Sequence, residues 1–371
     1  MLRSTFIFLA LASMMTWAAA EEKPANAVLD LKAVMDLSQL VEKVADRRVV
    51  YVGESHDRYQ HHLNQLAIIQ GLHARHPKLA IGLEFFFQPY QKVLDRYVAG
   101  EIDEAQMLRE TEYFDRWRFD YRLYRPILQY AREQGIPLIA LNLEREITDQ
   151  VAKAGMQSLT KAQQQRLPKE IARDDAAYRQ RIQSIYDQHP HTRSGDFERF
   201  LDVQLLWDEG MAERTARWLG DHPDSQLVVL AGVGHLLDRQ GIPDRVARRL
   251  PLSDAVILNT GSVDELDAKM GDYVILARDR QLPAAGKLGV FLDTGESPPR
   301  ISGFDETSGA AKAGVSKGDH LISIDGRPIR SYADIRIALI DKTVGETVEV
   351  EVERERVFVG TMKYNYSITL N

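Results

Sequence analysis

The sequence predicts an α/β domain whose mainly parallel sheet is covered by helices on both faces, with a helical excursion, followed by a small β-rich domain. Short apolar runs alternate with helical sequence until about residue 280, and short strands with tight turns follow. A chain of 371 residues, 44% of them apolar, is long enough to bury two cores. We therefore divide it into residues 1–20, 21–281 and 282–371.

Four apolar runs predict the strands of the first domain. Each is rich in Val, Ile and Leu and is followed by polar residues and helical sequence. Near-continuous apolar runs are typical of parallel strands that are buried on both faces. The runs are "RRVVYVG" (47–53), "KLAIGLEFF" (78–86), "GIPLIALN" (135–142) and "SQLVVLAGVG" (225–234).

Helical sequence connects these runs, as the crossovers of βαβ units require. The stretch 61–76 follows the first run and 88–113 follows the second, while 124–135 closes with Gly135 just before the third. Residues 157–222 are charged and helical in character, with apolar residues spaced like buried faces. We expect that segment to form a helical excursion or lid.

The last 90 residues carry a different pattern. Val348, Val350 and Val352 alternate with charged residues, which is the period of a half-exposed strand. One clear helix is expected at 331–341, where Ser331 and Asp334 are spaced as a capping box. The β-rich domain is expected to begin at about Leu282.

Net charge makes one class of partner improbable. The chain carries a formal charge of -7, and no block of Lys and Arg interleaved with aromatic residues occurs along it. Nucleic acid is therefore not expected as a partner.

The first twenty residues have the pattern of a secretory signal peptide. Arg3 provides a positive start, "FIFLALASMM" is a short apolar run, and three alanines end at Ala20 before acidic Glu21. This run is well short of a membrane span, and no other run is long and apolar enough to be one. The chain has no cysteine, which excludes disulfides, thiolate ligands and a lipid anchor on cysteine. We expect a periplasmic or secreted protein that is not a lipoprotein.

Polar residues follow each predicted strand of the first domain, where ligands bind in open α/β sheets. The first strand leaves Glu54 and His56, the second Glu84, the third Asn142 and the fourth His235. Glu84 lies between apolar residues, so it must meet a donor, a cation or a metal. It could equally be a core glutamate that binds backbone amides or Arg145.

Two histidines and a glutamate that converge from three strand ends favour a functional site over structural filler. His56, Glu84 and His235 would suit divalent zinc, manganese or iron, while a histidine or tyrosine could instead ligate haem iron. His61 and His62 begin the next helix. We expect at most one of them to point into the site, with the helix surface as an equal alternative, and we favour His62.

At this point the chain resembles the ChaN family of iron-regulated haem-binding proteins, over about residues 47–275. The resemblance rests on "VVYVGESHDRYQHHLNQ", "IGLEFFFQPYQKVLDRYVAGEID", "YRPILQYAREQGIPLIALN", "LWDEGMA" and "AGVGHLLDRQGIPDRV". It implies an α/β fold with haem in a pocket, as part of iron uptake. Related Tiki metalloproteases and erythromycin esterases carry motifs that fall on Gly53 to His56, Glu84, and Gly232 or Gly234 to His235. Many relatives are lipoproteins, and membrane tethering does not carry over because cysteine is absent.

The last domain resembles a PDZ module over about residues 282–363. "KLGVFLD" is similar to the loop that captures a peptide carboxylate, and the resemblance implies that a protein C-terminus adds as a strand beside Val290. Its side chain would lie against the helix near Ile335 and Leu339, with Leu288 and Gly289 in the loop. The alternative is a domain that only packs or forms a homodimer.

Two functions remain open. In the first, the chain is a non-catalytic haem-binding protein with His56, Glu84, His235, His62 and Asn142 at or near the pocket. In the second, it is a metal-dependent hydrolase, in which His56, Glu84 and His235 hold a divalent ion. Glu54 is then the general base, and the PDZ-like domain selects substrates.

Overall fold

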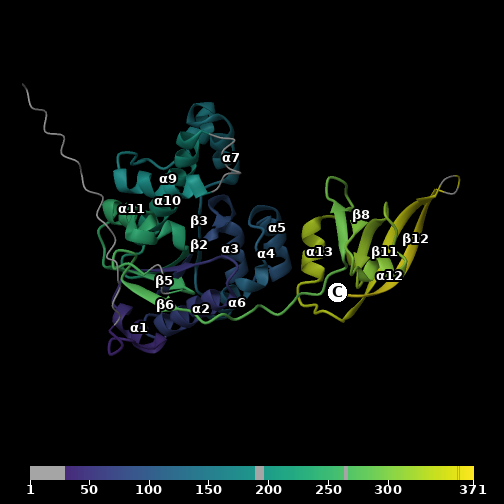
Figure 1. Cartoon of the computed structure of the whole chain (residues 1–371), viewed down its shortest axis with the longest axis horizontal. Coiled ribbons are helices and arrows are strands. Elements are labelled where there is room, and N and C mark those ends of the chain that lie inside the picture. Colours follow the sequence, from purple (N-terminus) through teal and green to yellow (C-terminus); the bar gives the residue numbers. More distant parts are fainter. Residues whose placement is uncertain (1–29, 189–195, 263–265, 357, 359) are drawn as a thin grey trace, which may run out of the picture. The chain divides into compact units, whose positions relative to one another are not determined.

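The computed structural model describes residues 30–188, 196–262, 266–356, 358 and 360–371. The predicted signal peptide at 1–20 lies outside these residues and stays a prediction. The α/β domain and the β-rich domain are described separately below (Figure 1).

A six-stranded sheet forms the centre of the first domain. Its order is β3-β2-β4-β1-β5-β6, and all neighbouring pairs are parallel, as the sequence predicts. The last two strands were not among the four apolar runs assigned from the sequence. The strands are β1 (Val49–Glu54), β2 (Leu79–Phe87), β3 (Leu138–Asn142), β4 (Gln226–Gly232), β5 (Asp254–Thr260) and β6 (Tyr273–Leu276).

Helices cover both faces of this sheet, with α10 and α11 on one face and α1, α2 and α6 on the other (Figure 1). Alternate residues of β1 explain why both faces are buried. Val50 packs in the core on the α2 side, whereas Val49 and Tyr51 pack with α10 residues such as Met211. The α-helices are α1 (Leu37–Val44), α2 (Tyr59–His73), α3 (Gln91–Val98), α4 (Glu104–Glu110), α5 (Tyr113–Arg116), α6 (Arg125–Gln134), α7 (Arg145–Ala154), α8 (Lys161–Gln164), α9 (Ala176–Gln188), α10 (Phe197–Asp221) and α11 (Ile242–Arg249). The 3₁₀ helices of this domain include η1 (Gln88–Tyr90), η2 (Tyr121–Leu123), η3 (Met156–Ser158), η5 (Val233–His235) and η6 (Leu237–Arg239).

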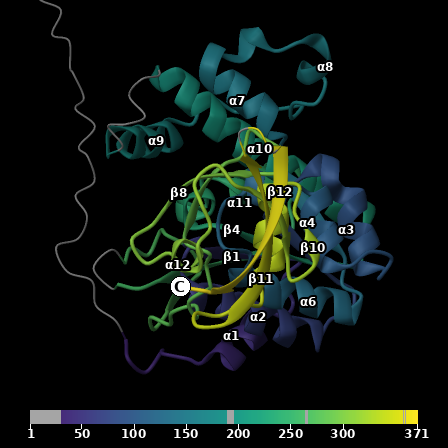
Figure 2. The ribbon, with the colours of Figure 1, turned by 90° about the vertical axis from the view of Figure 1, so that its right-hand side faces the viewer.

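The predicted helical excursion is present. Its residues 157–222 include α8, α9 and α10, and the preceding α7 lies with α8 and α9 at one end of the α/β domain, next to the start of α10 (Figures 1 and 2). Tyr178 and Ile182 of α9 are buried against Leu201 and Leu205 of α10. The excursion thus has a small core of its own and is joined to the sheet through the rest of α10.

The second domain is an antiparallel sheet of order β12-β11-β9-β8-β7, with β10 paired to β9. Val348, Val350 and Val352 are buried on one face, and Ser331 with Asp334 forms the expected capping box. Its elements are β7 (Val290–Asp293), β8 (Arg300–Phe304), α12 (Gly309–Ala313), β9 (His320–Ile324), β10 (Arg327–Pro328), α13 (Tyr332–Ala338), β11 (Thr347–Arg356) and β12 (Gly360–Thr369). Strand β7 is an edge strand of the sheet.

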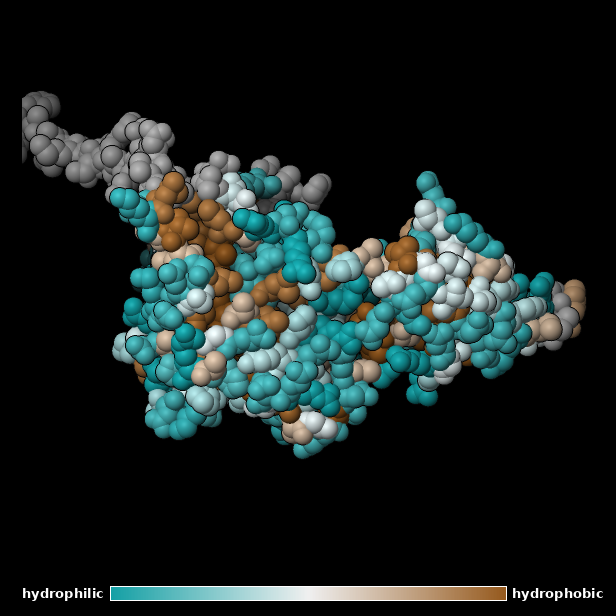
Figure 3. Space-filling view, turned by 90° about the horizontal axis from the view of Figure 1, so that it is seen from below, coloured by the Kyte–Doolittle hydropathy of each residue, from teal (hydrophilic) through white to brown (hydrophobic). Residues whose placement is uncertain are grey.

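Hydrophilic residues dominate the face of the molecule seen in Figure 3, although hydrophobic residues also reach it in places. No helix within the described ranges has both the length and the apolar character needed to span a bilayer.

Candidate functional site

The site lies where β1, β2 and β4 end side by side. Strand β4 is the common neighbour, because it pairs with β1 on one side and with β2 on the other. Glu54, the last residue of β1, is in register with Gly232, the last residue of β4. Glu84 directly follows the part of β2 that pairs with β4. His56 comes two residues after β1 ends, and His235 comes three residues after β4 ends. The predicted convergence at the strand ends is therefore present.

His56 has one bonded and one free ring nitrogen. Its Nδ1 is 2.6 Å from Oε1 of Glu54, while Nε2 has no hydrogen-bond or ion-pair partner within the described part of the chain. The ring is 27% exposed and lies 4.9 Å from the ring of Trp117 and 4.8 Å from that of Phe119. Burial disfavours the charged ring, but the bond to Glu54 and the charge of Glu84 together raise the pKa of His56. His56 can accept a proton or donate a lone pair through Nε2.

Glu84 is buried and fully engaged. Its Oε2 accepts a hydrogen bond of 2.7 Å from the amide of Gly232, and Oε1 lies 3.3 Å from Nε2 of His235. Burial alone would raise its pKa, but His235, then His56 and the Gly232 amide outweigh burial and lower the pKa to about 2. The partners are thus an amide and a histidine, and Arg145 binds elsewhere, at the Asp115 carbonyl.

Gly232 separates His56 from Glu84. A Cβ atom on this residue would be 3.0 Å from Cε1 of His56, 3.2 Å from its Nε2 and 3.7 Å from Oε2 of Glu84. The absence of a side chain therefore lets the imidazole and the carboxylate approach the same point.

His235 is held between two buried carboxylates. In addition to Glu84, Oδ1 of Asp208 lies 2.6 Å from its Nδ1, and the hydroxyl of Tyr178 donates to Oδ2 of Asp208 over 2.7 Å. Although burial lowers the pKa of His235, the charges of Glu84 and Asp208 raise it well above the ordinary value. The imidazolium form is therefore favoured, and both nitrogens are occupied.

Asp208 and Tyr178 were missed as site residues by sequence reasoning. Both belong to the helical excursion, Asp208 on α10 and Tyr178 on α9. A signal was available, because Asp208 lies in the run "LWDEGMA", where two adjacent acidic residues interrupt a mainly apolar stretch of a helix. Nothing local indicated that its partner would be His235.

Side chains of α2 hold the turn that carries His56. Nδ1 of His61 accepts a hydrogen bond of 3.0 Å from the amide of Ser55, and Nε2 of His62 is 3.2 Å from the His56 carbonyl. Both histidines are buried, so the helix-surface interpretation was wrong. His62 also comes within 3.9 Å of Oε2 of Glu54, whereas His61 reaches only backbone. Burial, with the charges of His62 and Arg58, lowers the pKa of His61 to about 4.

A ladder of buried amides supports the same turn. Asn64 donates to Oδ1 of Asn259 over 2.8 Å, and Asn259 donates to the carbonyl of Gly53 over 2.8 Å. Gln65 donates to the Val52 carbonyl over 3.0 Å and lies 3.1 Å from Nδ1 of His62. The position of His56 is thus fixed by polar residues of α2 and β5.

Asn142 lies at the end of β3, opposite Phe87. It is buried, and its Oδ1 has no hydrogen-bond partner among the described residues. No hydrogen bond or ion pair joins it to His56, Glu84 or His235 within that part of the chain, so its role in the site stays a prediction.

The site residues fit a haem iron better than a metal ion that is held by three side chains. Among the residues that the structure describes, no three His, Asp or Glu side chains are grouped as a metal ion would require. Of the two site histidines, only His56 has a free nitrogen, and Trp117 and Phe119 provide aromatic surface beside it. A single imidazole beside aromatic rings suits the iron and the flat macrocycle of haem.

The second domain carries its own candidate site along β7 and α13. Leu288 and Ile335 are buried, and Val290 and Leu339 pack against them, partly exposed. Gly289 has φ +72°, and a Cβ there would be 2.5 Å from Ser308. Outside strands and helices, the described hydrogen bonds include none from the amides of Leu288 or Gly289. Two free amides beside an edge strand and an aliphatic floor suit a peptide carboxylate.

Comparisons with known proteins find one family match in each part of the chain. Residues 40–246 match the family described as "Haem-binding uptake, Tiki superfamily, ChaN", and residues 286–361 match the PDZ domain family. The solved structure "Cofacial heme binding to ChaN of Campylobacter jejuni" has a TM-score of 0.54 and 17% sequence identity. The match covers 66% of this chain and 92% of that one, and at this identity it shows the fold alone.

One curated protein is similar in sequence. It is the chloroplastic protein RETICULATA-RELATED 5 of Arabidopsis thaliana, which is 23% identical over 240 residues. The match covers 60% of this chain but 32% of the plant protein, so the chain spans about a third of that relative's length.

Proposed function

Because the chain belongs to the ChaN family of haem-binding uptake proteins in the Tiki superfamily and carries a PDZ domain, we propose that it binds haem at the ends of β1 and β4. One observation carries the proposal. His56 presents an Nε2 with no hydrogen-bond partner among the described residues, on a part-exposed ring that packs against the rings of Trp117 and Phe119. Bound haem would supply an iron, and His56 is the residue that would hold it through Nε2.

Each neighbour of His56 has a distinct task in this proposal. Glu54 accepts a hydrogen bond from Nδ1, which orients the ring and makes Nε2 a stronger donor toward iron. Trp117 and Phe119 exclude water and offer apolar surface to a porphyrin. His235 takes no part as a ligand, because Asp208 and Glu84 occupy both its nitrogens.

Titration of the purified mature protein with hemin tests this proposal. We expect a saturable Soret band with the wild type, a marked loss of affinity in His56→Ala, and wild-type binding in His73→Ala. His73 is a matched control, because it is the last residue of α2 and its ring contacts Tyr130, away from the site. Equal hemin affinity in wild type and His56→Ala, or no more binding than to an unrelated protein, contradicts the proposal.

Hydrolysis is the second candidate, and the 2.6 Å pair of Glu54 and His56 favours it. A histidine that is oriented by a carboxylate and has a free nitrogen can act as a general base. The metal-dependent version, with a divalent ion on His56, Glu84 and His235, stays a prediction that elemental analysis of the purified protein tests. Activity on peptide or ester panels that is lost in Glu54→Gln would support hydrolysis, and inactivity on both panels counts against it.

The PDZ domain is proposed to bind the C-terminus of a partner protein. The free amides of Leu288 and Gly289, the edge strand β7 and the aliphatic side chains of Ile335 and Leu339 support this. The last residue of the ligand should then be apolar. Fluorescence polarisation with the full chain should detect a peptide ending in a free Leu or Val carboxylate, and the amidated peptide should not bind. Equal binding of both forms contradicts carboxylate capture.

We also propose that the protein is exported to the periplasm as a soluble species. The support is the sequence pattern at residues 1–20 and the lack of cysteine. Cell fractionation with N-terminal sequencing should find a mature chain that begins at Glu21. A cytoplasmic chain that retains Met1 contradicts export.

A further inference from the structure

We propose that Asp208 is a positioning residue, which holds the ring of His235 against Glu84 and so keeps Glu84 from occupying the free nitrogen of His56. This inference rests on the proposed function, because it explains how Nε2 of His56 stays available. Among the described residues no hydrogen bond or ion pair joins Asp208 to His56, so it acts through His235 and Glu84.

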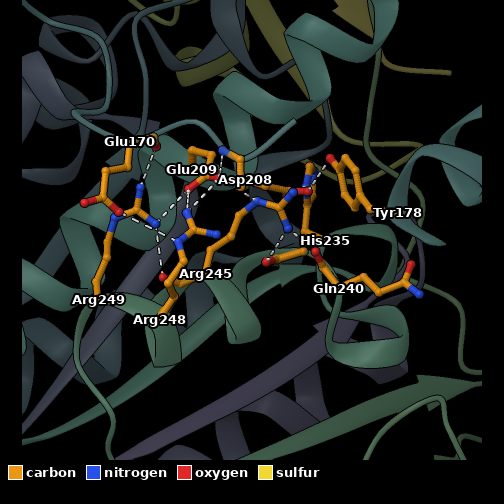
Figure 4. A network of polar contacts seen from close by, with 11 residues as sticks. Glu170, Tyr178, Asp208, Glu209, His235, Gln240, Arg245, Arg248 and Arg249 are labelled. Atoms are coloured by element: carbon orange, nitrogen blue, oxygen red, sulfur yellow. Dashed lines mark hydrogen bonds and ion pairs between the residues drawn. The ribbon is translucent and has the colours of Figure 1, made fainter. Parts of the chain in front are cut away.

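The contacts of Asp208 leave its carboxylate no freedom. The residue is 1% exposed, and its two oxygens have different partners. Oδ1 lies 2.6 Å from Nδ1 of His235, and Oδ2 accepts a hydrogen bond of 2.7 Å from Tyr178 (Figure 4). A carboxylate on one nitrogen of a histidine fixes the orientation of the ring. Nε2 of His235 is thereby directed at Oε1 of Glu84, 3.3 Å away.

Glu84 is the residue that this arrangement controls. Its buried carboxylate has two partners, the Gly232 amide and His235. If His235 turned away, Oε1 would lose its donor in a site where an unpaired charge is costly. Another donor is nearby, because Nε2 of His56 and Oε2 of Glu84 lie 3.2 and 3.7 Å from the position of a Cβ on Gly232. Glu84 would then bind His56 and remove the free nitrogen.

The surroundings of Asp208 show that it has its own task, separate from that of its neighbour Glu209. Glu209 is fully buried and pairs with Arg245, Arg248 and Arg249 of α11 (Figure 4). Arg245 also lies 4.2 Å from the ring of Tyr178. Glu209 therefore joins α10 to α11, while Asp208 faces the site.

The loop of His235 is anchored at both ends as well. Arg181 of α9 donates to the Gly234 carbonyl over 2.8 Å, and Arg245 donates to the Gly241 carbonyl over 3.1 Å. These bonds hold the backbone on either side of His235. Orientation of the ring itself is left to Asp208, which makes a single substitution informative.

The test compares Asp208→Asn with Glu209→Gln in the full chain. Nuclear magnetic resonance of the protein without hemin should show a low-field imidazole N–H signal from His235 in the wild type, because the bond to Asp208 is short and charge-assisted. The signal should persist in Glu209→Gln and vanish in Asp208→Asn. In Asp208→Asn, the ring nitrogen shifts of His56 should also move as Glu84 binds it. These readouts do not need haem.

Hemin titration then links the arrangement to the proposed function. We expect Asp208→Asn to bind hemin about 10- to 100-fold more weakly than the wild type, as is usual when a residue that orients a ligand is changed. Glu209→Gln should be less stable than the wild type. It should still bind hemin within about twofold of the wild type, since the residues that orient His56 and His235 are unchanged. If Glu209→Gln does not fold, Arg248→Gln serves instead, because it removes one cation from Glu209 and leaves the bond between Asp208 and His235 in place.

The outcomes are distinguishable. A wild type that binds no hemin contradicts the proposed function, and the resonance data still decide whether Asp208 positions His235 and frees His56. Unchanged His56 shifts in Asp208→Asn overturn the inference, as does a hemin affinity that falls equally in both variants.

Discussion

The ends of β1 and β4 carry the same short pattern, Gly-x-x-His, and the structure gives its two histidines opposite states. Gly53 precedes His56 by three residues, and Gly232 precedes His235 by three. His56 keeps one free nitrogen on a part-exposed ring, while both nitrogens of His235 face buried carboxylates. The motif sets where each histidine lies, and residues from distant segments decide what it can do.

This contrast is also one of energetics. The backbone of the turn at His56 is held chiefly by the neutral amides of Asn64, Gln65 and Asn259, and the His56 ring pairs with one carboxylate, that of Glu54. His235 is held by the charges of Glu84 and Asp208, in a place where water does not screen them. Removal of a partner should therefore cost more at β4 than at β1.

The largest expected effect comes from His235→Ala. The substitution leaves Glu84 and Asp208 buried without their shared cation, which should cost about 3–5 kcal/mol in the free energy of unfolding. His56→Ala, at a part-exposed ring, should cost less than about 2 kcal/mol. Urea denaturation of the two variants measures the difference, and equal losses would remove the contrast between the two ends.

Acid should lower the stability that Glu84 gains from its pairing with His235. The pKa of Glu84 is about 2 in the folded chain against 4.5 as its ordinary value. A lowered carboxyl pKa adds stability that is complete above the unfolded pKa and is lost as the pH falls from about 5 to about 2. The loss should be on the order of 3 kcal/mol. Denaturation at a series of pH values should show this slope in the wild type and a shallower slope in Glu84→Gln. Equal slopes in the two proteins would show that the loss of stability in acid does not come from protonation of Glu84.

Asn259→Ala tests the neutral scaffold at β1. It removes the hydrogen bonds that Asn259 makes with the Gly53 carbonyl and the amide of Asn64, for a cost of about 1–3 kcal/mol. The expected loss is independent of pH between 5 and 8, unlike that at β4. A pH-dependent loss in this range would mean that the two ends are coupled.

The smallest effect is expected from Tyr178→Phe, which removes one hydrogen bond to Asp208 and leaves His235 paired. We expect a cost of about 1 kcal/mol. A cost as large as that of His235→Ala would show that Tyr178, and not the histidine, is the main partner of Asp208.

Much of the fold followed from patterns that are local in the sequence. Strands β1 to β4, their parallel direction and the helices on both faces were predicted, because buried parallel strands have continuous apolar sequence. The PDZ domain was predicted from its resemblance to that family. Convergence of Glu54, His56, Glu84 and His235 followed in turn, since the ends of parallel strands share one edge of the sheet.

Partnerships between side chains could not be predicted in the same way. Asp208 reaches His235 only because α10 packs on the sheet in one register, and no local pattern encodes that register. His61 and His62 were uncertain for a related reason. Helix α2 buries polar residues as well as apolar ones, so its amphipathic pattern is weak and gave no clear inner face.

Strand order has a further consequence, for the sequence of events during folding. Strand β4 is inserted between β1 and β2, so that Val49 pairs with Leu227 and Leu79 with Gln226. The centre of the sheet therefore cannot close until most of the α/β domain has been synthesised. Contacts so far apart in sequence slow folding. For a chain that we propose is exported, a late-closing sheet would leave time for translocation before the tertiary structure forms.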